Sequence, residues 1–178
     1  MSGFILRDVC LEDFSLILTW WNDVEMQYLV GQCGDDWHPD SLRQWFNLPP
    51  HKQQSWVIAL PDGAIGTAEL AGISSSKKSA NLQIIIGEKG WWHHGIGSAV
   101  AHTVCMKAFG AIGLESLFLK IPAYNERALA WAKKIGFKLS HCQPAPINFK
   151  GKIVTLQIYL LCRDDFLNNN RNSIQENI

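Results

Sequence analysis

The sequence predicts a mixed α/β protein built around one sheet. Residues 82–86 form a short, nearly continuous apolar run, as expected of a strand buried on both faces. Residues 94–98 supply a glycine turn that leads into a long helix-forming segment. The elements are expected in the order strand, two helices, three strands, helix, strand, helix and two strands. This order is too irregular for a repeated β–α–β series, so we expect a mixed sheet.

The N-terminal third is expected to hold one strand and two helices. Residues 4–9 have the composition of a strand, and apolar residues recur at helical spacing in residues 11–21. Residues 24–36 contain two glycines and a pair of aspartates, which indicate a loop. A second helix ends at residue 46 and is capped by Asp40 or Ser41.

The middle of the chain is expected to form strands. Residues 55–60 and 64–70 are joined at 61–63 by Pro-Asp-Gly, in which proline fixes φ and glycine tolerates positive φ. The strand at 82–86 follows, and residues 117–121 form another short apolar strand after the central helix.

The C-terminal part is expected to hold one helix and a final pair of strands. Asn125 caps a helix that carries Ala128, Trp131 and Ile135 on one face and stops at Gly136. The two strands, residues 137–142 and 153–161, form a final hairpin at the end of a single domain that spans residues 1–163. Residues 164–178 form a polar tail, which we expect to be loosely ordered from Asn168 onward.

Composition narrows the function classes. The 178 residues have a formal net charge of zero, which gives no indication of nucleic acid or an anionic membrane as partner. Five scattered cysteines without a Cys-x-x-Cys pair indicate neither a disulfide framework nor a zinc site. No His/Glu spacing suggests metal ligands, so we expect no metal. We expect a soluble, cytoplasmic protein, since the N-terminus lacks a signal pattern and no apolar run approaches membrane-spanning length.

The glycine turn at residues 94–98 is the strongest chemical signal in the sequence. A turn that feeds a helix N-terminus presents N–H groups without intrahelical acceptors at the positive end of the helix dipole, which favours an anion. We therefore expect this turn to bind a pyrophosphate; the alternative is an ordinary strand-to-helix turn. The nucleotide-hydrolase P-loop pattern is absent, and Val100 occupies the third glycine position of the dinucleotide fingerprint.

Several segments together resemble one family. Residues 95–97 (GIG), 125–128 (NERA) and 134–137 (KIGF) resemble the GNAT superfamily of acetyl-CoA-dependent N-acetyltransferases. Residues 18–23 (LTWWND) are similar to the branch of ribosomal-protein N-terminal acetyltransferases, and residues 79–86 (SANLQIII) to spermidine acetyltransferases. The resemblance implies a twisted mixed sheet of about seven strands, splayed at the centre and flanked by helices on both faces. Relatives are often dimers, so the resemblance also makes a homodimer a candidate state for this chain.

The resemblance implies a cofactor site for acetyl-CoA. The pantetheine arm pairs with the open edge of the central strand, the pyrophosphate lies on the glycine turn, and the asparagine that begins the last helix contacts the cofactor. The expected cofactor residues are Ile84, Ile85, Ile86, Trp92, His93, His94, Gly95, Ile96, Gly97, Ser98 and Asn125. His93 and His94 have the alternative of being solvated.

The acid/base half of the family pattern is different in this sequence. Asn81 replaces the acid that many members carry on the central strand, and is a candidate acceptor-binding residue. Ala132 replaces the tyrosine that acts as general acid in spermidine-type members. The catalytic candidates are therefore Glu69, a carboxylate in an apolar strand, as base and Tyr124 as donor to the thiolate. The alternative for Glu69 is an ion pair at the end of the strand, and the alternative for Tyr124 is a tyrosine on the protein surface.

The acceptor is expected to be a primary amine. Asp35, Asp36 and Trp37 are candidate acceptor contacts because acids and aromatics suit a cationic amine, with a solvated loop as the alternative. The sequence does not choose among a protein N-terminus, a polyamine, an amino sugar and an aminoglycoside. A module that binds acetyl-CoA with little or no transfer, and more weakly a nucleotide-dependent oxidoreductase, remain open.

Overall fold

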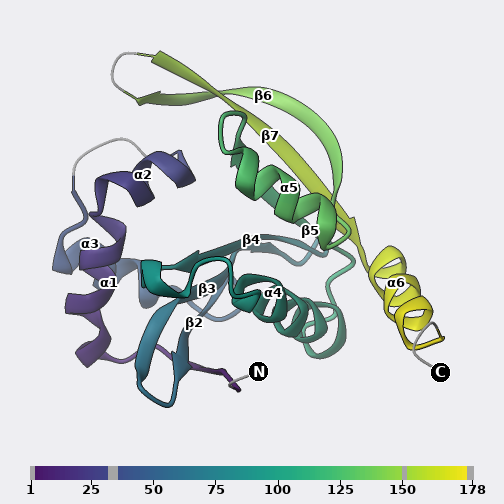
Figure 1. Cartoon of the computed structure of the whole chain (residues 1–178), viewed down its shortest axis with the longest axis horizontal. Helices are drawn as coiled ribbons and strands as arrows, with labels where there is room; N and C mark the ends of the chain where they lie inside the picture. Colours follow the sequence, from purple (N-terminus) through teal and green to yellow (C-terminus); the bar gives the residue numbers. More distant parts are fainter. Residues whose placement is uncertain (1–2, 32–35, 150–151, 176–178) are drawn as a thin grey trace.

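Seven strands form one mixed sheet in the order β1-β2-β3-β4-β5-β7-β6 (Figure 1). The computed structural model describes residues 3–31, 36–149 and 152–175, with side chains in 3–31, 36–144 and 153–169. The strands are β1 (Ile5–Asp8), β2 (Gln53–Leu60), β3 (Gly63–Ser74), β4 (Ser79–Ile86), β5 (Ser116–Pro122), β6 (Lys138–Phe149) and β7 (Lys152–Cys162). Only β4 and β5 pair in parallel within this sheet of described residues, so the expected mixed sheet is confirmed.

Helices cover both faces of the sheet, as expected. The α-helices are α1 (Phe14–Trp21), α2 (Val24–Val30), α3 (Pro39–Phe46), α4 (Ile96–Met106), α5 (Glu126–Lys134) and α6 (Arg163–Gln175). Short helical turns are η1 (Leu11–Asp13), η2 (Lys89–Trp91) and η3 (Lys107–Ala111), the last a π-helical continuation of α4. Helices α1, α2 and α3 share an apolar cluster with β2 and β4, whereas α4, α5 and α6 pack on the other face.

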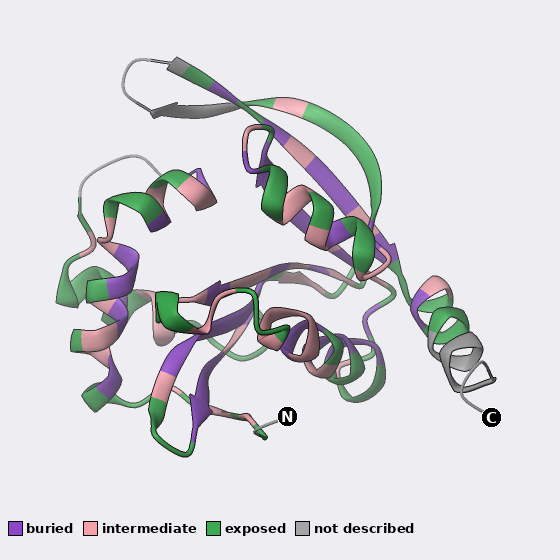
Figure 2. Ribbon diagram, viewed as in Figure 1, coloured by how far each residue is buried: buried purple, intermediate pink, exposed green. Residues whose placement is uncertain are grey.

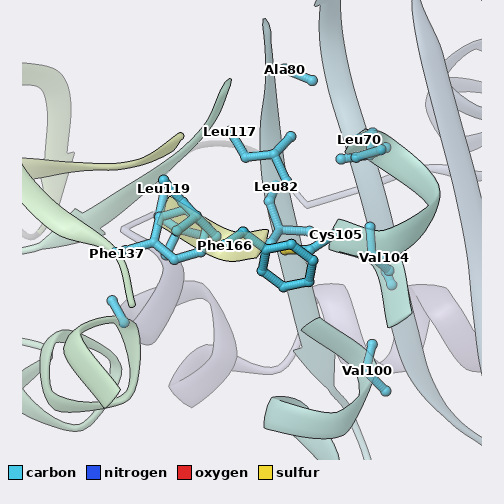
Figure 3. Packing of buried hydrophobic residues seen from close by; sticks show 14 of the residues in the cluster. Leu70, Ala80, Leu82, Val100, Val104, Cys105, Leu117, Leu119, Phe137 and Phe166 are labelled. Atoms are coloured by element: carbon cyan, nitrogen blue, oxygen red, sulfur yellow. The ribbon is translucent and has the colours of Figure 1, made fainter. Parts of the chain in front are cut away.

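The larger core lies between the sheet and helices α4 to α6. Val100 and Val104 of α4 are fully buried against this face, and Leu70 and Leu82 lie on the strands that face them (Figure 3). Figure 2 shows that buried residues concentrate in β2, β3 and the helix surfaces turned to the sheet. This packing fixes the start of α4, and with it the glycine turn, above the end of β4.

The sheet splits between β4 and β5. Their parallel pairing covers only residues 79–81 of β4 and 116–118 of β5. Residues 82–86 remain paired with β3 on the other side, so their β5-facing edge has no strand partner among the described residues. The splayed centre implied by the resemblance is therefore confirmed.

The prediction of a loop at residues 24–36 is wrong for its first half, which forms α2. The Asp23 side chain accepts a hydrogen bond from the Met26 amide at 3.0 Å, and Gly31 ends the helix with φ of 70°. These two residues resemble loop formers in the sequence, but here they act as the helix cap and the helix stop.

The expectation of loose order from Asn168 onward is wrong for residues 168–175, because residues 163–175 form α6. Asp164 and Asp165 lie in the first turn, where carboxylates interact favourably with the helix dipole. Phe166 is buried and its ring lies 5.4 Å from that of Phe109. Among the described side chains, Phe166 thus packs this mostly polar helix against the core.

Candidate functional site

A cavity of about 740 Å³ occupies the split between β4 and β5. One wall is the edge of β4 with the glycine turn, and the opposite wall is the end of β5 with α5. Of the eleven expected cofactor residues, the ten that line it are Ile84, Ile85, Ile86, Trp92, His93, Gly95, Ile96, Gly97, Ser98 and Asn125. The sheet topology therefore brings the separately predicted strand, turn and helix to one place.

The glycine turn has the backbone geometry of an anion site. Gly95 is the N-cap of α4 with φ of 78°, and His93 also has a positive φ, of 66°. Ile96 and Gly97 are the first two helical residues, whose amides have no intrahelical acceptor. The amides of Trp92 and Ser98 instead donate within the turn, to Lys89 and Gly95 at 3.1 Å each. The amides available for an anion are therefore those in the middle of the expected segment.

The open edge of β4 is partly covered by the chain itself. The Trp92 indole Nε1 donates to the Ile86 carbonyl at 2.8 Å. This bond holds the Trp92 ring beside the last residue of the strand. A pantetheine arm that pairs with β4 would therefore use backbone groups before Ile86 or compete with Trp92.

His94 is the one expected cofactor residue that does not line the cavity. Its Nδ1 lies 2.8 Å from the Trp92 carbonyl, and its ring lies 5.7 Å from that of Trp91. His94 is therefore an exposed residue on the outside of the turn, which favours the alternative that its side chain is solvated.

The opposite wall contains residues that sequence reasoning did not assign to the site. Arg127, Trp131 and Lys134 line the cavity from α5, at the i, i+4, i+7 spacing of one helix face. The Arg127 Cζ lies 4.2 Å from the centroid of the Trp92 ring, which places a cation on an aromatic face across the split. The sequence contained this signal as a spacing, but it could not show that the face points at the turn.

The cavity is cationic although the chain is neutral. Lys120, Arg127 and Lys134 line it, and none of them is in an ion pair within the part of the chain that the structure describes. No Asp or Glu of the described residues is in the lining. Such a surface favours a polyanionic ligand.

The side chains of Asn125 and Tyr124 connect the start of α5 to α2 by hydrogen bonds. The Asn125 side chain accepts from the Ala128 amide at 3.0 Å and donates to the Leu29 carbonyl at 2.8 Å, so it ties α5 to α2. The Tyr124 hydroxyl donates to the Tyr28 carbonyl at 2.6 Å, and Tyr124 does not line the cavity. In this structure both side chains therefore position helices, and their expected chemical roles remain predictions.

Glu69 is fully buried behind the cavity wall. Trp45 Nε1 donates to its Oε2 at 3.1 Å, and its Oε1 has no partner among the described residues. Burial raises the pKa of Glu69 to about 7, with the Trp45 hydrogen bond opposing the shift. The residue does not line the cavity, but its cross-strand partner Gln83 does. The alternative of an ion pair at the strand end is excluded among the described residues.

Asn81 lies where the two strands separate. It lines the cavity, and its side-chain Oδ1 is buried without a hydrogen-bond partner among the described residues. An unsatisfied amide oxygen at this point favours a ligand N–H. Ala132 of α5 is fully buried in the core and brings no proton donor to the cavity.

The predicted acceptor loop is only partly described. Asp35 lies outside the described residues, and Asp36 is exposed. The Trp37 backbone forms two hydrogen bonds with the Asn22 side chain, and its ring lies 4.7 Å from that of Trp21. Trp37 therefore packs over α1, and neither it nor Asp36 lines the cavity.

Two further features bear on partners. No helix in the described ranges is both long and apolar enough to cross a membrane. Among the described residues, no cluster of His, Cys, Asp and Glu has the composition of a metal site.

Comparison with known proteins identifies the family. The model of the Acetyltransferase (GNAT) domain matches residues 4–138. The chain belongs to the GNAT acetyltransferase family. As a member it is an acyltransferase, and its acetyl donor is acetyl-CoA.

Solved structures show the same GNAT fold. Spermidine N-acetyltransferase of Vibrio cholerae in complex with CoA and spermine matches with a TM-score of 0.84 and 18% identity, covering 94% of this chain and 99% of that one. A dodecameric structure of spermidine N-acetyltransferase from the same organism, in an intermediate state, matches with a TM-score of 0.79 and 19% identity, covering 95% and 99%. Comparison with curated proteins gives no match.

Proposed function

We propose that this protein transfers an acetyl group from acetyl-CoA to a primary amine, with polyamines as the first acceptor class to test. One observation carries the proposal: a cationic cavity of about 740 Å³ joins the open edge of β4 to the glycine turn. Polyamines come first because a structural relative is described in complex with spermine. Protein N-termini, amino sugars and aminoglycosides are the other acceptor classes.

The chain's own groups suit acetyl-CoA as substrate. Bound there, acetyl-CoA would supply an activated thioester. The amides of Ile96 and Gly97 would bind its diphosphate, and the β4 edge at residues 84–86 would hold the arm beside the split. The unpaired cations on the cavity wall complement its phosphate charge.

We assign the acceptor side to Asn81 and Glu69. The free Oδ1 of Asn81 is placed to accept a hydrogen bond from the attacking amine and hold it at the split. An amine that attacks must lose a proton, and a carboxyl with a pKa of about 7 is suited to accept it near neutral pH. Because Glu69 is buried and does not line the cavity, the proton would reach it through a water molecule that accepts it from the amine and passes one on to the carboxylate.

The first experiment combines binding with turnover. Calorimetric titration with CoA measures the Kd, and thiol release from acetyl-CoA is followed with spermidine, spermine, N-terminal peptides and amino sugars. We expect CoA binding and thiol release that depends on at least one amine. CoA binding without release for any amine would leave only the alternative of a binding module, and absence of CoA binding would refute the assignment of the cavity.

The second experiment tests the base. Glu69→Gln should lower kcat by about 100-fold or more, since general bases contribute this much. Glu115→Gln is the matched control, because Glu115 is exposed and pairs with Lys78 outside the cavity. A Glu69→Gln enzyme with the wild-type pH–rate profile would remove Glu69 from the mechanism.

We also propose that the chain assembles into a homo-oligomer. A structural relative is dodecameric. In this chain β6 and β7 extend past α5 (Figure 1), and Leu139 and Ile153 on them are 52% and 78% exposed. Light scattering that gives the mass of one chain, about 20 kDa, at micromolar concentration would contradict this proposal.

A further inference from the structure

The side chain of Trp131 contains a hydrogen-bond donor that has no acceptor among the described residues. Its indole Nε1 is buried, and no acceptor for it exists among the described residues. A buried N–H without an acceptor is unfavourable, and native proteins rarely contain one without a water, ion or ligand that satisfies it.

The position of this donor is informative. Trp131 lines the cavity from α5, and a Cβ added to Gly97 would lie 3.9 Å from the Trp131 Nε1. The indole Nε1 therefore lies close to Gly97, in the turn whose first helical amides have no intrahelical acceptor. Donors from two different helices surround the same small volume.

Arg127 adds charge to the same wall. It lies four residues before Trp131, so the two side chains share one face of α5. Its guanidinium rests on the Trp92 ring, and it has no carboxylate partner within the described ranges. Donors and positive charge thus come from α5 as well as from α4.

We infer that Trp131 is a cofactor-binding residue: its Nε1 donates a hydrogen bond to the diphosphate of acetyl-CoA from the side opposite the glycine turn. This rests on the proposed function, which places acetyl-CoA in the cavity. It goes beyond that proposal because the anion is then bound between two helices and not by one helix N-terminus. The alternative is that Trp131 only packs its ring against neighbouring apolar groups.

Trp131→Phe separates the two roles, since phenylalanine keeps an aromatic ring and removes the N–H. By calorimetry we expect the Kd for CoA to rise about tenfold, the effect of losing one hydrogen bond to a charged group. The Kd for pantetheine, which has no diphosphate, should change by less than about twofold. Trp56→Phe is the matched control, because Trp56 is a buried tryptophan that does not line the cavity.

A second measurement needs no variant. In a ¹⁵N-correlated NMR spectrum of the wild-type protein, the indole resonance of Trp131, assigned through side-chain correlations to its own backbone amide, should move downfield on addition of CoA and not of pantetheine. This remains available if Trp131→Phe fails to fold.

The outcomes are distinct. Equal CoA affinity of Trp131→Phe and wild type, or an indole resonance that ignores CoA, overturns the inference and leaves the proposed function intact. Equal weakening for CoA and pantetheine assigns Trp131 to packing and also overturns it. A wild-type protein that binds no CoA overturns the proposed function itself.

Discussion

Replacement of Glu69 by glutamine should change how stability depends on pH. Glu69 is fully buried, and burial raises its pKa from 4.5 to about 7. Between these values the unfolded chain has released the proton while the folded chain retains it, so stability falls as pH rises from about 4.5 to about 7. At about 1.4 kcal/mol for each pH unit, the total loss is about 3 kcal/mol.

Glutamine has a similar shape, can still accept the Trp45 hydrogen bond, and does not titrate. We therefore expect Glu69→Gln to gain about 3 kcal/mol over the wild type between pH 5 and pH 8. For a chain of this length this corresponds to a relative increase in Tm of about 6–12 °C. All other titrating groups are present in both proteins, so their contributions to the pH dependence cancel in the difference between the two unfolding free energies.

The assay is urea unfolding of both proteins at half-unit steps from pH 5 to pH 8, followed by far-UV circular dichroism. The quantity of interest is the difference in unfolding free energy at each pH. A difference that stays constant within about 1 kcal/mol would show that Glu69 ionises in the folded protein much as it does in the unfolded chain, and the reasoning from burial would fail.

Three further outcomes are expected. Gly97→Glu should abolish measurable CoA binding with an unchanged far-UV spectrum, and Gly97→Ala, whose methyl meets only the Trp131 Nε1 at 3.9 Å, should fold; normal CoA affinity of the glutamate variant would contradict the anion site. Gly87→Ala should lower Tm by about 6–10 °C because its methyl would overlap the Trp20 ring, and an unchanged Tm would show that the ring can move at little cost. Asp13, which accepts two hydrogen bonds from Arg7, has a pKa lowered to about 2, so Asp13→Asn should be less stable than wild type at pH 7 and equal to it near pH 2; a deficit that persists at pH 2 would have another cause.

The strands and the glycine turn were predictable because their signals are local. The run at 82–86 and the turn at 61–63 each carry their pattern within a few residues. Helices α2 and α6 were missed for a physical reason. Asp23 and Gly31 have the same composition signal whether they cap a helix or form a loop, and α6 is attached to the core mainly through Phe166. Only tertiary contacts decide such cases.

The residues of the first wall were predictable, whereas on the second wall only Asn125 was. The turn and the β4 edge could be recognised because glycine spacing and apolar runs are sequence patterns. Trp131 was expected to pack on an apolar helix face, and the contact of its Nε1 side with Gly97 depends on how α5 crosses the sheet. Tyr124 was a candidate acid, but its hydroxyl donates a hydrogen bond to the carbonyl of Tyr28 in α2, which lies 96 residues earlier in the chain.

The electrostatic character of the site follows from how the acids are distributed, which net charge conceals. Asp13, Glu115 and Asp165 are each engaged by a basic side chain away from the cavity, and Lys89 holds two more acids near α2. Since the total charge is zero, the three cations that line the cavity are balanced by acids that lie elsewhere in the chain. Under the proposed function, the phosphates of the donor would lie in a positive field, while the acceptor amine, a cation in water, would be repelled from it. The acceptor should therefore approach from the face of the sheet that carries Glu69, where losing its proton removes the repulsion and makes the amine nucleophilic.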